Sequence, residues 1–198
     1  MIIWLNGAFG AGKTQTAYEL HRRIPRSFVF DPENAGYYIR TNIPQEMARP
    51  DFQEHPVWRG INYEMLTYIA SGYDGTLIVP MTVTDPGYWD ELVGRLKRSG
   101  LDVHHFTLTV SREVLLKRLR SRFEGQGSWA AQQIDRCVKS LADETFACHL
   151  NTDNLTIAEA AERIAAHLHI ELEPDSRGGL KKTMDRITTQ LKHIRWFG

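Results

Sequence analysis

The chain has 198 residues, of which 42% are hydrophobic and 24% are charged, as is typical of a globular protein with one sizeable core. Its 24 basic and 24 acidic residues give a net charge of zero, which excludes a protein that binds nucleic acid through a strong overall positive field. Cys137 and Cys148 lack the spacing of a zinc site. No apolar run reaches the roughly 20 residues of a membrane span, and no signal peptide precedes the first strand. We therefore expect a cytoplasmic protein.

Short apolar runs alternate with helical stripes along most of the chain, which is the pattern of a parallel α/β fold. The apolar runs predict strands at residues 2–5, 27–30, 76–81, 104–110 and 146–150. Helical spacing and capping residues predict helices at residues 14–23, 57–71, 86–99, from 112, at 130–141 and from 157. Residues 34–56 show no clear period, and we interpret them as short helices and loops that cap the site.

The first predicted strand runs into a glycine-rich phosphate-binding loop. Residues 7–14 read GAFGAGKT and fit the pattern G-x-x-x-x-G-K-[ST], with a strand before it and a helix after it. Glycines let backbone N–H groups approach a triphosphate, and the positive end of the following helix points at the phosphates. Lys13 adds a charge for the β- and γ-phosphates, and the Thr14 hydroxyl can ligate Mg²⁺. The predicted contacts to ATP or GTP are Gly7, Ala8, Phe9, Gly10, Ala11, Gly12, Lys13, Thr14 and Gln15.

The surroundings of this loop narrow the class of nucleotide-binding protein. No N-K-x-D sequence of a switch GTPase is present, and the strand TLIVPM runs into residues 82–85, Thr-Val-Thr-Asp, rather than the paired acids of a motor ATPase. These absences and the small size favour a phosphotransferase of the nucleoside-monophosphate or shikimate kinase type. We therefore predict a three-layer P-loop fold with a five-stranded parallel sheet in the strand order 2-3-1-4-5.

Asp31 is the candidate catalytic carboxylate. It follows the second strand and should emerge at the carboxyl edge of the sheet, where ligands bind in open α/β folds. A carboxylate there could accept the proton of an attacking hydroxyl or hold a Mg²⁺-bound water. The alternative is an aspartate that only caps the turn before Pro32.

Arg118 and Arg122 stand four residues apart in front of a glycine-bearing loop, and we predict a lid at about residues 120–135. Two guanidinium groups there could close over ATP and neutralise the transferred phosphoryl group. The R-L-x-x-R pattern resembles the lid entrance of adenylate kinases, and residues 152–154 resemble their adenine-edge loop, which implies that Asp153 contacts the nucleotide. The alternatives are a solvated basic face and an ordinary turn.

The acceptor is expected at the cap of residues 34–72. Trp58-Arg59 resembles the aromatic–arginine pair that grips the acceptor's carboxylate in shikimate kinases, and Arg40 could help Arg59 to hold an anionic group. Residues 31–33, Asp-Pro-Glu, lack the D-x-D of that family, so shikimate itself is not the expected acceptor. Four aromatic residues could face a base or an acyl chain, or could instead pack in the core: Tyr37, Tyr38, Trp58 and Trp89.

A distinct tail follows Gly178-Gly179, and we divide the chain into a kinase-like domain at 1–175 and a basic amphipathic helix at 176–198. Apolar residues in the segment 180–197 form one narrow helical stripe with basic residues beside it. Such a helix suits an anionic membrane surface. It could equally dock on its own domain or on a second copy, and the sequence indicates no oligomeric state.

A resemblance to a known family covers almost the whole chain. It rests on the segments IIWLNGAFGAGKTQTAYELHRR, DFQEHPVWR, LIVPMTV, GRLKRSGLDVHHFTL, LLKRLRSR, SWAAQQIDRCV, TDNLTIAEAAERIA and LKHIR. Together these resemble the ATP-binding tunicamycin resistance proteins of Gram-positive bacteria. The resemblance implies a cytosolic ATP-binding protein that protects the cell from a fatty-acylated nucleoside antibiotic, and a C-terminal amphipathic helix that associates with the membrane.

Three functions remain open from the sequence. The first is an enzyme that transfers the γ-phosphate of ATP to a hydroxyl of tunicamycin, with Lys13, Asp31, Arg118 and Arg122 in the catalytic site. The second is a protein that binds the drug at the membrane in an ATP-dependent way without changing it. The third is a kinase of a nucleotide or sugar metabolite.

Overall fold

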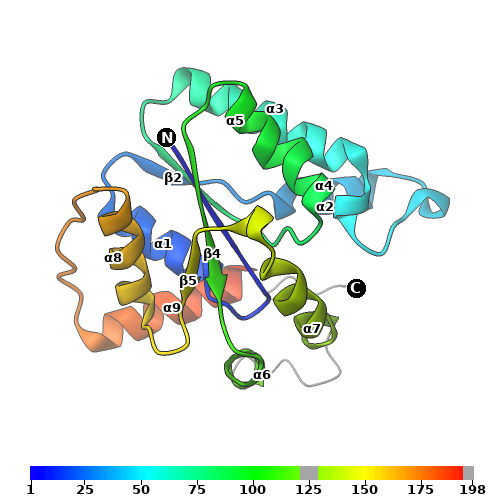
Figure 1. The fold of residues 1–198 in the computed structure, drawn as a ribbon. Helices are drawn as coiled ribbons and strands as arrows, with labels where there is room; N and C mark the ends of the chain where they lie inside the picture. The colour runs from blue at the N-terminus through cyan, green and yellow to red at the C-terminus, as the bar shows by residue number, and fades with distance from the viewer. Residues whose placement is uncertain (121–128, 194–198) are drawn as a thin grey trace.

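A five-stranded parallel sheet forms the centre of the molecule, in the order β2-β3-β1-β4-β5 (Figure 1). The computed structural model describes residues 1–120 and 129–193. Central β1 pairs with β3 on one side and β4 on the other, with Trp4 opposite Val79 and His105. The strands are β1 (Ile2–Gly7), β2 (Ser27–Val29), β3 (Thr76–Pro80), β4 (Val103–Thr109) and β5 (His149–Asn151). The predicted fold class and strand order are confirmed.

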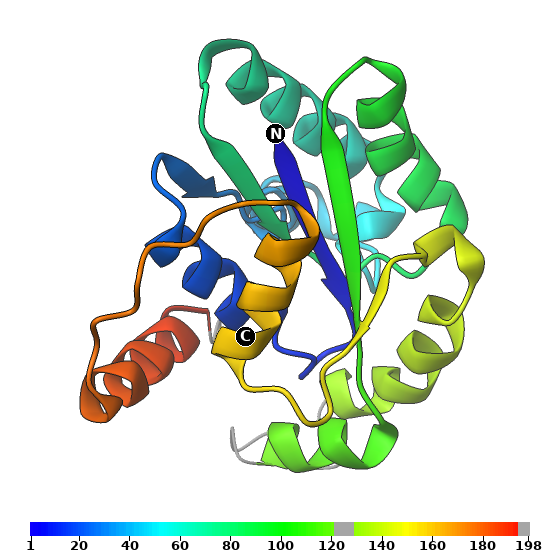
Figure 2. The same ribbon diagram turned by 60° about the vertical axis from the view of Figure 1, so that its left-hand side comes forward.

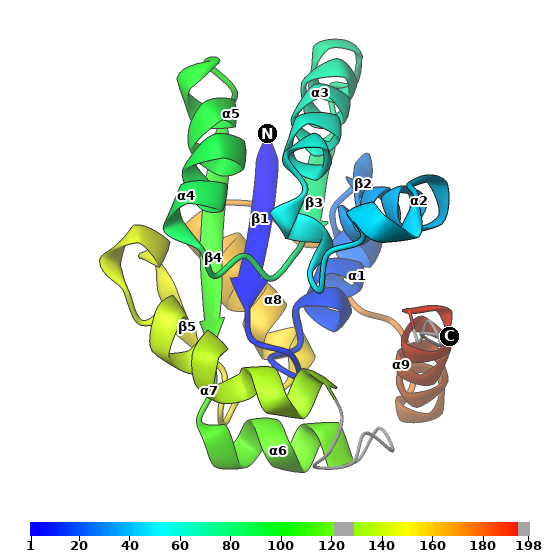
Figure 3. The same cartoon turned by 90° about the vertical axis from the view of Figure 1, so that its right-hand side faces the viewer.

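Helices cover both faces of the sheet and make three layers (Figures 2 and 3). One face carries α1 (Lys13–Arg23) and α8 (Ile157–His167), which pack against each other. The other carries α3 (Pro56–Gly72) and a continuous helical stretch formed by α4 (Pro86–Trp89), a π-helical turn at Asp90–Gly94 and α5 (Arg95–Arg98). Helices α6 (Arg112–Arg120) and α7 (Trp129–Leu141) pack together at the carboxyl ends of the strands.

The capping residues set the helix starts that the sequence predicts. The Asp85 carboxylate accepts a hydrogen bond from the backbone N–H of Tyr88, 2.9 Å away, with Pro86 in the first turn of the helix. Thr156 and Glu159 form a capping box in which each side chain accepts from the other residue's backbone N–H. Local sequence therefore determines where α4 and α8 begin.

The fifth strand differs from the prediction, whereas residues 34–56 form short helices and loops as predicted. The fifth strand begins at His149 rather than at Phe146, because Glu144–Phe146 forms a 3₁₀ turn that puts the Phe146 ring in the core with no exposed surface. Within residues 34–56 the structure forms a regular ten-residue helix, α2 (Glu33–Asn42), followed by short 3₁₀ turns at Gln45–Met47 and Phe52–Glu54. The cap is thus more ordered than its sequence indicates.

The core lies between β1, β3 and the helices on both faces. Trp4 on β1 has no exposed surface, and its ring packs edge-on against Trp89 at a centroid distance of 5.8 Å. Trp89 in turn contacts the rings of His105 and Phe146. Trp89 is therefore a core residue, as in the alternative considered for it above.

The C-terminal helix α9 (Gly179–His193) packs against α1 through ion pairs (Figures 2 and 3). Arg177 donates to both carboxylate oxygens of Glu19 on α1, at 2.8 and 2.7 Å, and also binds Asp175 and Asp185 at 2.7 and 2.9 Å. Burial alone would raise the pKa of Glu19, but hydrogen bonds from Arg22 and Arg177 hold that pKa below its usual value. A buried charge cluster thus fastens α9 to the domain.

The apolar stripe of α9 faces away from this cluster. Leu180, Met184 and Ile187 are 86%, 67% and 51% exposed, although they are the apolar residues of an amphipathic helix. Among the described residues, none of the helices is both long and apolar enough to cross a membrane. Docking on the protein and presenting an apolar surface are therefore compatible in α9. The division of the chain at residue 175 stays a prediction.

Candidate nucleotide and acceptor site

The loop between β1 and α1 has the backbone geometry of a phosphate cradle. Gly7 has φ of +146°, and a Cβ there would lie 2.8 Å from the Leu108 carbonyl oxygen. Gly12 has φ of +101° and precedes α1 without any side chain capping the helix. Both positions require glycine. The first backbone N–H groups of α1 are thus left for a ligand, as anion binding at a helix start needs.

Lys13 lies folded over this loop. Its Nζ donates to the carbonyl oxygens of Gly7 and Ala8 at 3.0 and 3.1 Å, and lies 5.7 Å from the centroid of the Phe9 ring. Thr14 is half-buried in the first turn of α1, on the same loop. The cradle, the ammonium group and the hydroxyl therefore occur together, and these groups fit a Mg²⁺-bound triphosphate.

A buried polar network, which the sequence analysis missed, fixes the loop to the end of β3. The Asn6 side chain donates to the Val83 carbonyl at 2.8 Å, and its oxygen accepts from the N–H groups of Val83 and Gly7, both at 2.9 Å. The Thr82 hydroxyl donates to the Gly7 carbonyl at 2.9 Å. The segment that follows TLIVPM thus holds the phosphate loop in place. In the sequence, the polar residue Asn6 within the otherwise apolar first strand could have indicated this network.

Arg118 and the turn at residues 152–153 lie together beside the phosphate loop. Arg118 donates to the Thr152 carbonyl at 2.7 Å and to the Ala11 carbonyl at 3.4 Å. Asp153 accepts from the backbone N–H of Ser111 at 2.7 Å, which ties this turn to the start of α6. The predicted nucleotide-side residues Arg118 and Asp153 are therefore neighbours in space, although 34 residues separate Arg118 from Thr152.

Helix α9 reaches the same region. The side chain of Gln15 on α1 donates to the Arg186 carbonyl at 3.0 Å. Burial lowers the pKa of Arg118, the carboxylate of Asp153 opposes this change, and the charge of Arg186 adds to it. Since Gln15 lies in the first turn of α1, directly after the phosphate loop, its hydrogen bond to Arg186 places the docked helix at the nucleotide side of the site.

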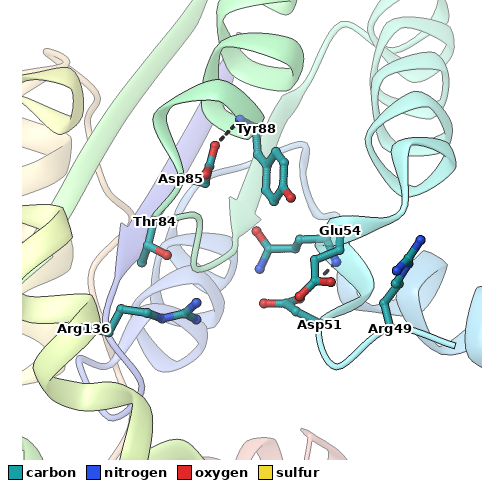
Figure 4. A pocket seen from close by; sticks show the side chains of 8 residues that line it. Arg49, Asp51, Glu54, Thr84, Asp85, Tyr88 and Arg136 are labelled. Carbon is teal, nitrogen blue, oxygen red and sulfur yellow. Dashed lines mark hydrogen bonds between the residues drawn. The ribbon is translucent and has the colours of Figure 1, made fainter.

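A cavity of about 290 Å³ lies on the other side of the phosphate loop, between the cap, the β3–α4 loop and α7 (Figure 4). Asp51, Glu54 and Asp85 supply carboxylates, and Arg136 points across the cavity from α7 toward the 51–54 turn. Further lining residues are Arg49, Gln53, Thr84 and Tyr88. Every lining side chain carries a polar group. Such a cavity suits a ligand that offers many hydrogen bonds.

The thiol of Cys137 connects this cavity to the phosphate loop. Burial raises the pKa of Cys137, the charges of Lys13 and Arg136 lower it, and the charge of Asp51 raises it further. Hydrogen bonds give the same connection: Gln53, which lines the cavity, donates to the Thr82 carbonyl, and the Thr82 hydroxyl donates to the Gly7 carbonyl. Since Gly7 also accepts from Lys13, the cavity adjoins the phosphate end of the nucleotide site.

The predicted acceptor residue Arg59 is already engaged by the protein. It is 7% exposed, pairs with Glu91, donates to the Gln53 carbonyl, and stacks on the Tyr88 ring at 4.2 Å. Gln53 in turn donates to the Thr82 carbonyl at 3.0 Å. In this structure Arg59 braces the cavity wall through Tyr88 and Gln53 and does not line the cavity.

The other predicted acceptor residues lie around the same wall. Trp58 has no exposed surface and donates to the Pro32 carbonyl at 3.0 Å, so it supports α2 as a core residue. Arg40 lies over the Phe52 ring at 5.4 Å and donates to the Pro50 carbonyl. Tyr37 packs against the same ring at 6.4 Å. Tyr38, by contrast, is 64% exposed. The structure does not place any of these side chains among those lining the cavity.

Asp31 lies at the carboxyl end of β2, as predicted, but outside the lining of the cavity. Its carboxylate accepts from the backbone N–H of Glu33 at 3.0 Å, so it has the capping role considered as the alternative. Burial raises the pKa of Tyr18 on α1, and the charge of Asp31 raises it further, which places Asp31 near α1. Its catalytic role stays a prediction. Arg122 lies outside the described residues, as does most of the glycine-bearing loop.

Comparison with known proteins identifies relatives of this fold. Residues 2–143 match the AAA domain family. A tunicamycin resistance protein from Deinococcus radiodurans is similar at 40% sequence identity and a TM-score of 0.77, over 88% of this chain and 98% of that one. No curated protein sequence matches the chain.

Two kinases share the fold at lower identity. A shikimate kinase from Bacteroides thetaiotaomicron matches at 20% identity and a TM-score of 0.58, over 86% of this chain and 99% of that one. The Mycobacterium tuberculosis APS kinase, solved with AMPPNP and APS, matches at 16% identity and a TM-score of 0.56, over 85% and 96% of the two chains. At these identities the likeness shows the fold alone.

Proposed function

We propose that this chain transfers the γ-phosphate of ATP to a hydroxyl of tunicamycin or a related nucleoside antibiotic. The chain belongs to the family of the tunicamycin resistance proteins and has a P-loop kinase-like AAA domain. The observation that carries this proposal is the position of the polar cavity. It adjoins the phosphate loop through Gln53 and Thr82, so a hydroxyl bound there can approach the phosphate that the loop holds.

The donor half of the reaction uses groups from the phosphate loop and α6. Backbone N–H groups of the loop and the ammonium of Lys13 hold the β- and γ-phosphates and stabilise the charge of the transition state. Arg118, anchored on the Thr152 carbonyl, positions the nucleotide together with Asp153. The Thr14 hydroxyl would hold a Mg²⁺ ion, which would supply further charge neutralisation.

The acceptor half begins with a hydroxyl of the drug in the cavity. The bond from the γ-phosphorus to the bridging oxygen of ATP breaks, a bond from the phosphorus to the acceptor oxygen forms, and ADP leaves with the bonding electrons. The hydroxyl proton passes to a carboxylate. Asp31 is the sequence-based candidate, and Asp51 is the candidate that the cavity adds.

A second candidate function is ATP-dependent sequestration of the drug without chemistry. The exposed side chains of Leu180, Met184 and Ile187 favour it, because they offer an apolar surface for a lipid membrane that also holds an acylated drug. Membrane association through α9 is compatible with both functions and is itself part of this proposal. A metabolite kinase, the third function above, uses the same donor site.

Mass spectrometry of tunicamycin after incubation with the protein and Mg·ATP tests the proposal. We expect the drug to gain the mass of one phosphate, and we expect no gain with Lys13→Ala. Asp31→Asn and Asp51→Asn should be compared in the same assay at saturating drug, because the variant that loses the larger share of kcat identifies the proton acceptor. Asp74→Asn is the matched control, since the Asp74 side chain is 87% exposed and pairs with Arg26 at the surface.

One outcome would reject phosphotransfer and favour sequestration. Tunicamycin that binds to the protein with ATP present, yet keeps its mass over many hours, is bound but not modified. A drug that neither binds nor changes, while another small metabolite gains phosphate, would instead favour the metabolite kinase.

A further inference from the structure

We propose that the cavity takes an uncharged, hydroxyl-rich part of the acceptor, such as a sugar ring, and leaves any acyl chain outside. This inference deepens the function proposed above and rests on it for the identity of the ligand. It comes from three features of the cavity: its carboxylates, its balance of charge, and its size and polarity.

The carboxylates of Asp51, Glu54 and Asp85 supply the hydrogen-bond acceptors. They come from two separate segments, the 51–54 turn and the β3–α4 loop, and they surround one hollow (Figure 4). Asp51 and Asp85 each use one oxygen to cap a helix start, through Gln53 and Tyr88, which fixes their side-chain orientation. A carboxylate accepts hydrogen bonds and cannot donate them, so its natural partners here are hydroxyl or N–H groups.

The balance of charge argues against an anionic acceptor. Among the described residues that line the cavity there are three carboxylates and two arginines, Arg49 and Arg136. Lys13 at the edge of the cavity is taken by the phosphates of the nucleotide in the proposed complex, so a phosphate or carboxylate group of the acceptor would meet more negative than positive charge. Arg59 cannot reverse this balance while it pairs with Glu91. Arg40, the other candidate for an anion, lies outside the cavity over Phe52. Nucleotide and shikimate-type acceptors are therefore disfavoured.

Size and polarity argue against an acyl chain. The cavity volume of about 290 Å³ is at the lower end of the roughly 300–1,000 Å³ of small-molecule sites, so it fits a compact group rather than a whole lipidated drug. None of the described residues in the lining has an aliphatic side chain, and burying a hydrocarbon chain against carboxylates would desolvate them without compensation. An acyl chain would remain in solvent or in a membrane.

Binding measurements without turnover test this inference. Calorimetry with the full chain and Mg·ADP would compare tunicamycin with its uncharged core, in which an acetyl group replaces the fatty acyl chain, and with UMP and shikimate as anionic probes. We expect this core to bind within tenfold of the whole drug and both anions to bind at least tenfold more weakly than the core. A core that binds more than tenfold more weakly than the whole drug, or an anion that binds as tightly as the core, would overturn the inference.

Three variants connect the binding to the cavity. Asp51→Asn keeps an oxygen for the cap but removes the charge, and Glu54→Gln removes a charge from an exposed carboxylate that caps nothing in the described structure. Each should weaken the core by about tenfold, the loss of a charge-assisted hydrogen bond, while Asp74→Asn leaves it unchanged. Unchanged binding by both cavity variants would contradict the assignment. No phosphate is transferred in this assay, so it is independent of the phosphotransfer test. Phosphotransfer can therefore fail while the cavity assignment holds, and the cavity assignment can fail while phosphotransfer holds.

Discussion

Replacing Arg177 by glutamine should release α9 from the domain. The guanidinium of Arg177 is 11% exposed and holds Glu19 of α1 and Asp185 of α9 at once. Glutamine is too short and uncharged, so Glu19, whose side chain is 6% exposed, would keep only Arg22 as a cationic partner. Without this contact α9 would lose its main ionic attachment to α1.

The free energy that docking of α9 loses in Arg177→Gln follows from how deeply each ion-pair partner is buried. Removing one member of a buried ion pair costs about 3–5 kcal/mol. Asp185 is 31% exposed, Arg22 stays beside Glu19, and Lys182 stays beside Asp175, so the three carboxylates that lose Arg177 are each partly compensated. We therefore expect a loss of about 2–3 kcal/mol, which lowers the docking equilibrium roughly 30- to 150-fold.

Hydrogen exchange of the α9 backbone measures this equilibrium. An isolated helix as short as the 15 residues of α9 is marginal in water, so an undocked α9 would unfold and exchange. In Arg177→Gln the protection of the α9 amides against exchange should fall roughly 30- to 150-fold, while the protection of the β1 amides should change little.

Arg112→Gln is the control for this experiment. Arg112 pairs with Asp135, and both side chains are more than half exposed, so its loss should cost less than about 1 kcal/mol. Protection of α9 that is equal in Arg177→Gln and in the unmodified protein would refute the reasoning, because the ion cluster would then not hold the helix.

Three further changes test other parts of the structure. Lys13→Ala should weaken ATP binding at least 100-fold in calorimetry without altering the fold, and retained affinity would show that the loop does not bind the triphosphate. Asn6→Ala should lower the free energy of unfolding by about 3 kcal/mol in urea, because it leaves buried backbone groups of Val83 unpaired; an unchanged midpoint would contradict this. Burial and the charge of Lys97 lower the pKa of His105 to about 4 in the folded state. Because the unfolded chain takes up this proton already near pH 6.5, the free energy of unfolding should fall as the pH is lowered from about 6.5 toward 4. His105→Phe should remove that part of the pH dependence, and an unaltered profile would assign it to other groups.

The sequence predicts the donor side well because its signals are local. The phosphate loop is one contiguous motif, and its glycines are needed by the backbone of the loop itself, as the φ values of Gly7 and Gly12 confirm. Capping residues such as Asp85 and Thr156 act within three residues of the helix start. Apolar runs also predict the strands, and the parallel topology follows from their alternation with helices.

The acceptor side could not be predicted in the same way, since it depends on contacts between distant segments. Arg59 and Glu91 are 32 residues apart, so the sequence does not reveal that this guanidinium is occupied by the protein. Similarly, Trp58 in the sequence suggests a ligand contact, but its side chain is in the core. The rule that ligands bind at the carboxyl ends of strands identified Asp31, and the same rule could also have identified Asp85. Asp51 lies in a segment without periodicity and gave no such signal.

The alternatives considered for α9 also depended on distant contacts. Its apolar stripe is visible in the sequence, but the ion cluster that docks its other side requires Glu19, about 158 residues before Arg177. A docked helix can therefore keep Leu180 and Met184 exposed. This arrangement places a helix with an exposed apolar stripe beside the nucleotide side of the site, through the contact between Gln15 and the Arg186 carbonyl.

The most direct test of the central claim is a single-turnover experiment with ATP labelled in its γ-phosphate. Excess protein is mixed with labelled Mg·ATP and tunicamycin, and the label is followed among ATP, inorganic phosphate and the drug. The proposal predicts that the label moves to the drug, and that Lys13→Ala abolishes this transfer. Label that stays on ATP, or that appears only as inorganic phosphate while the drug is bound, would contradict it.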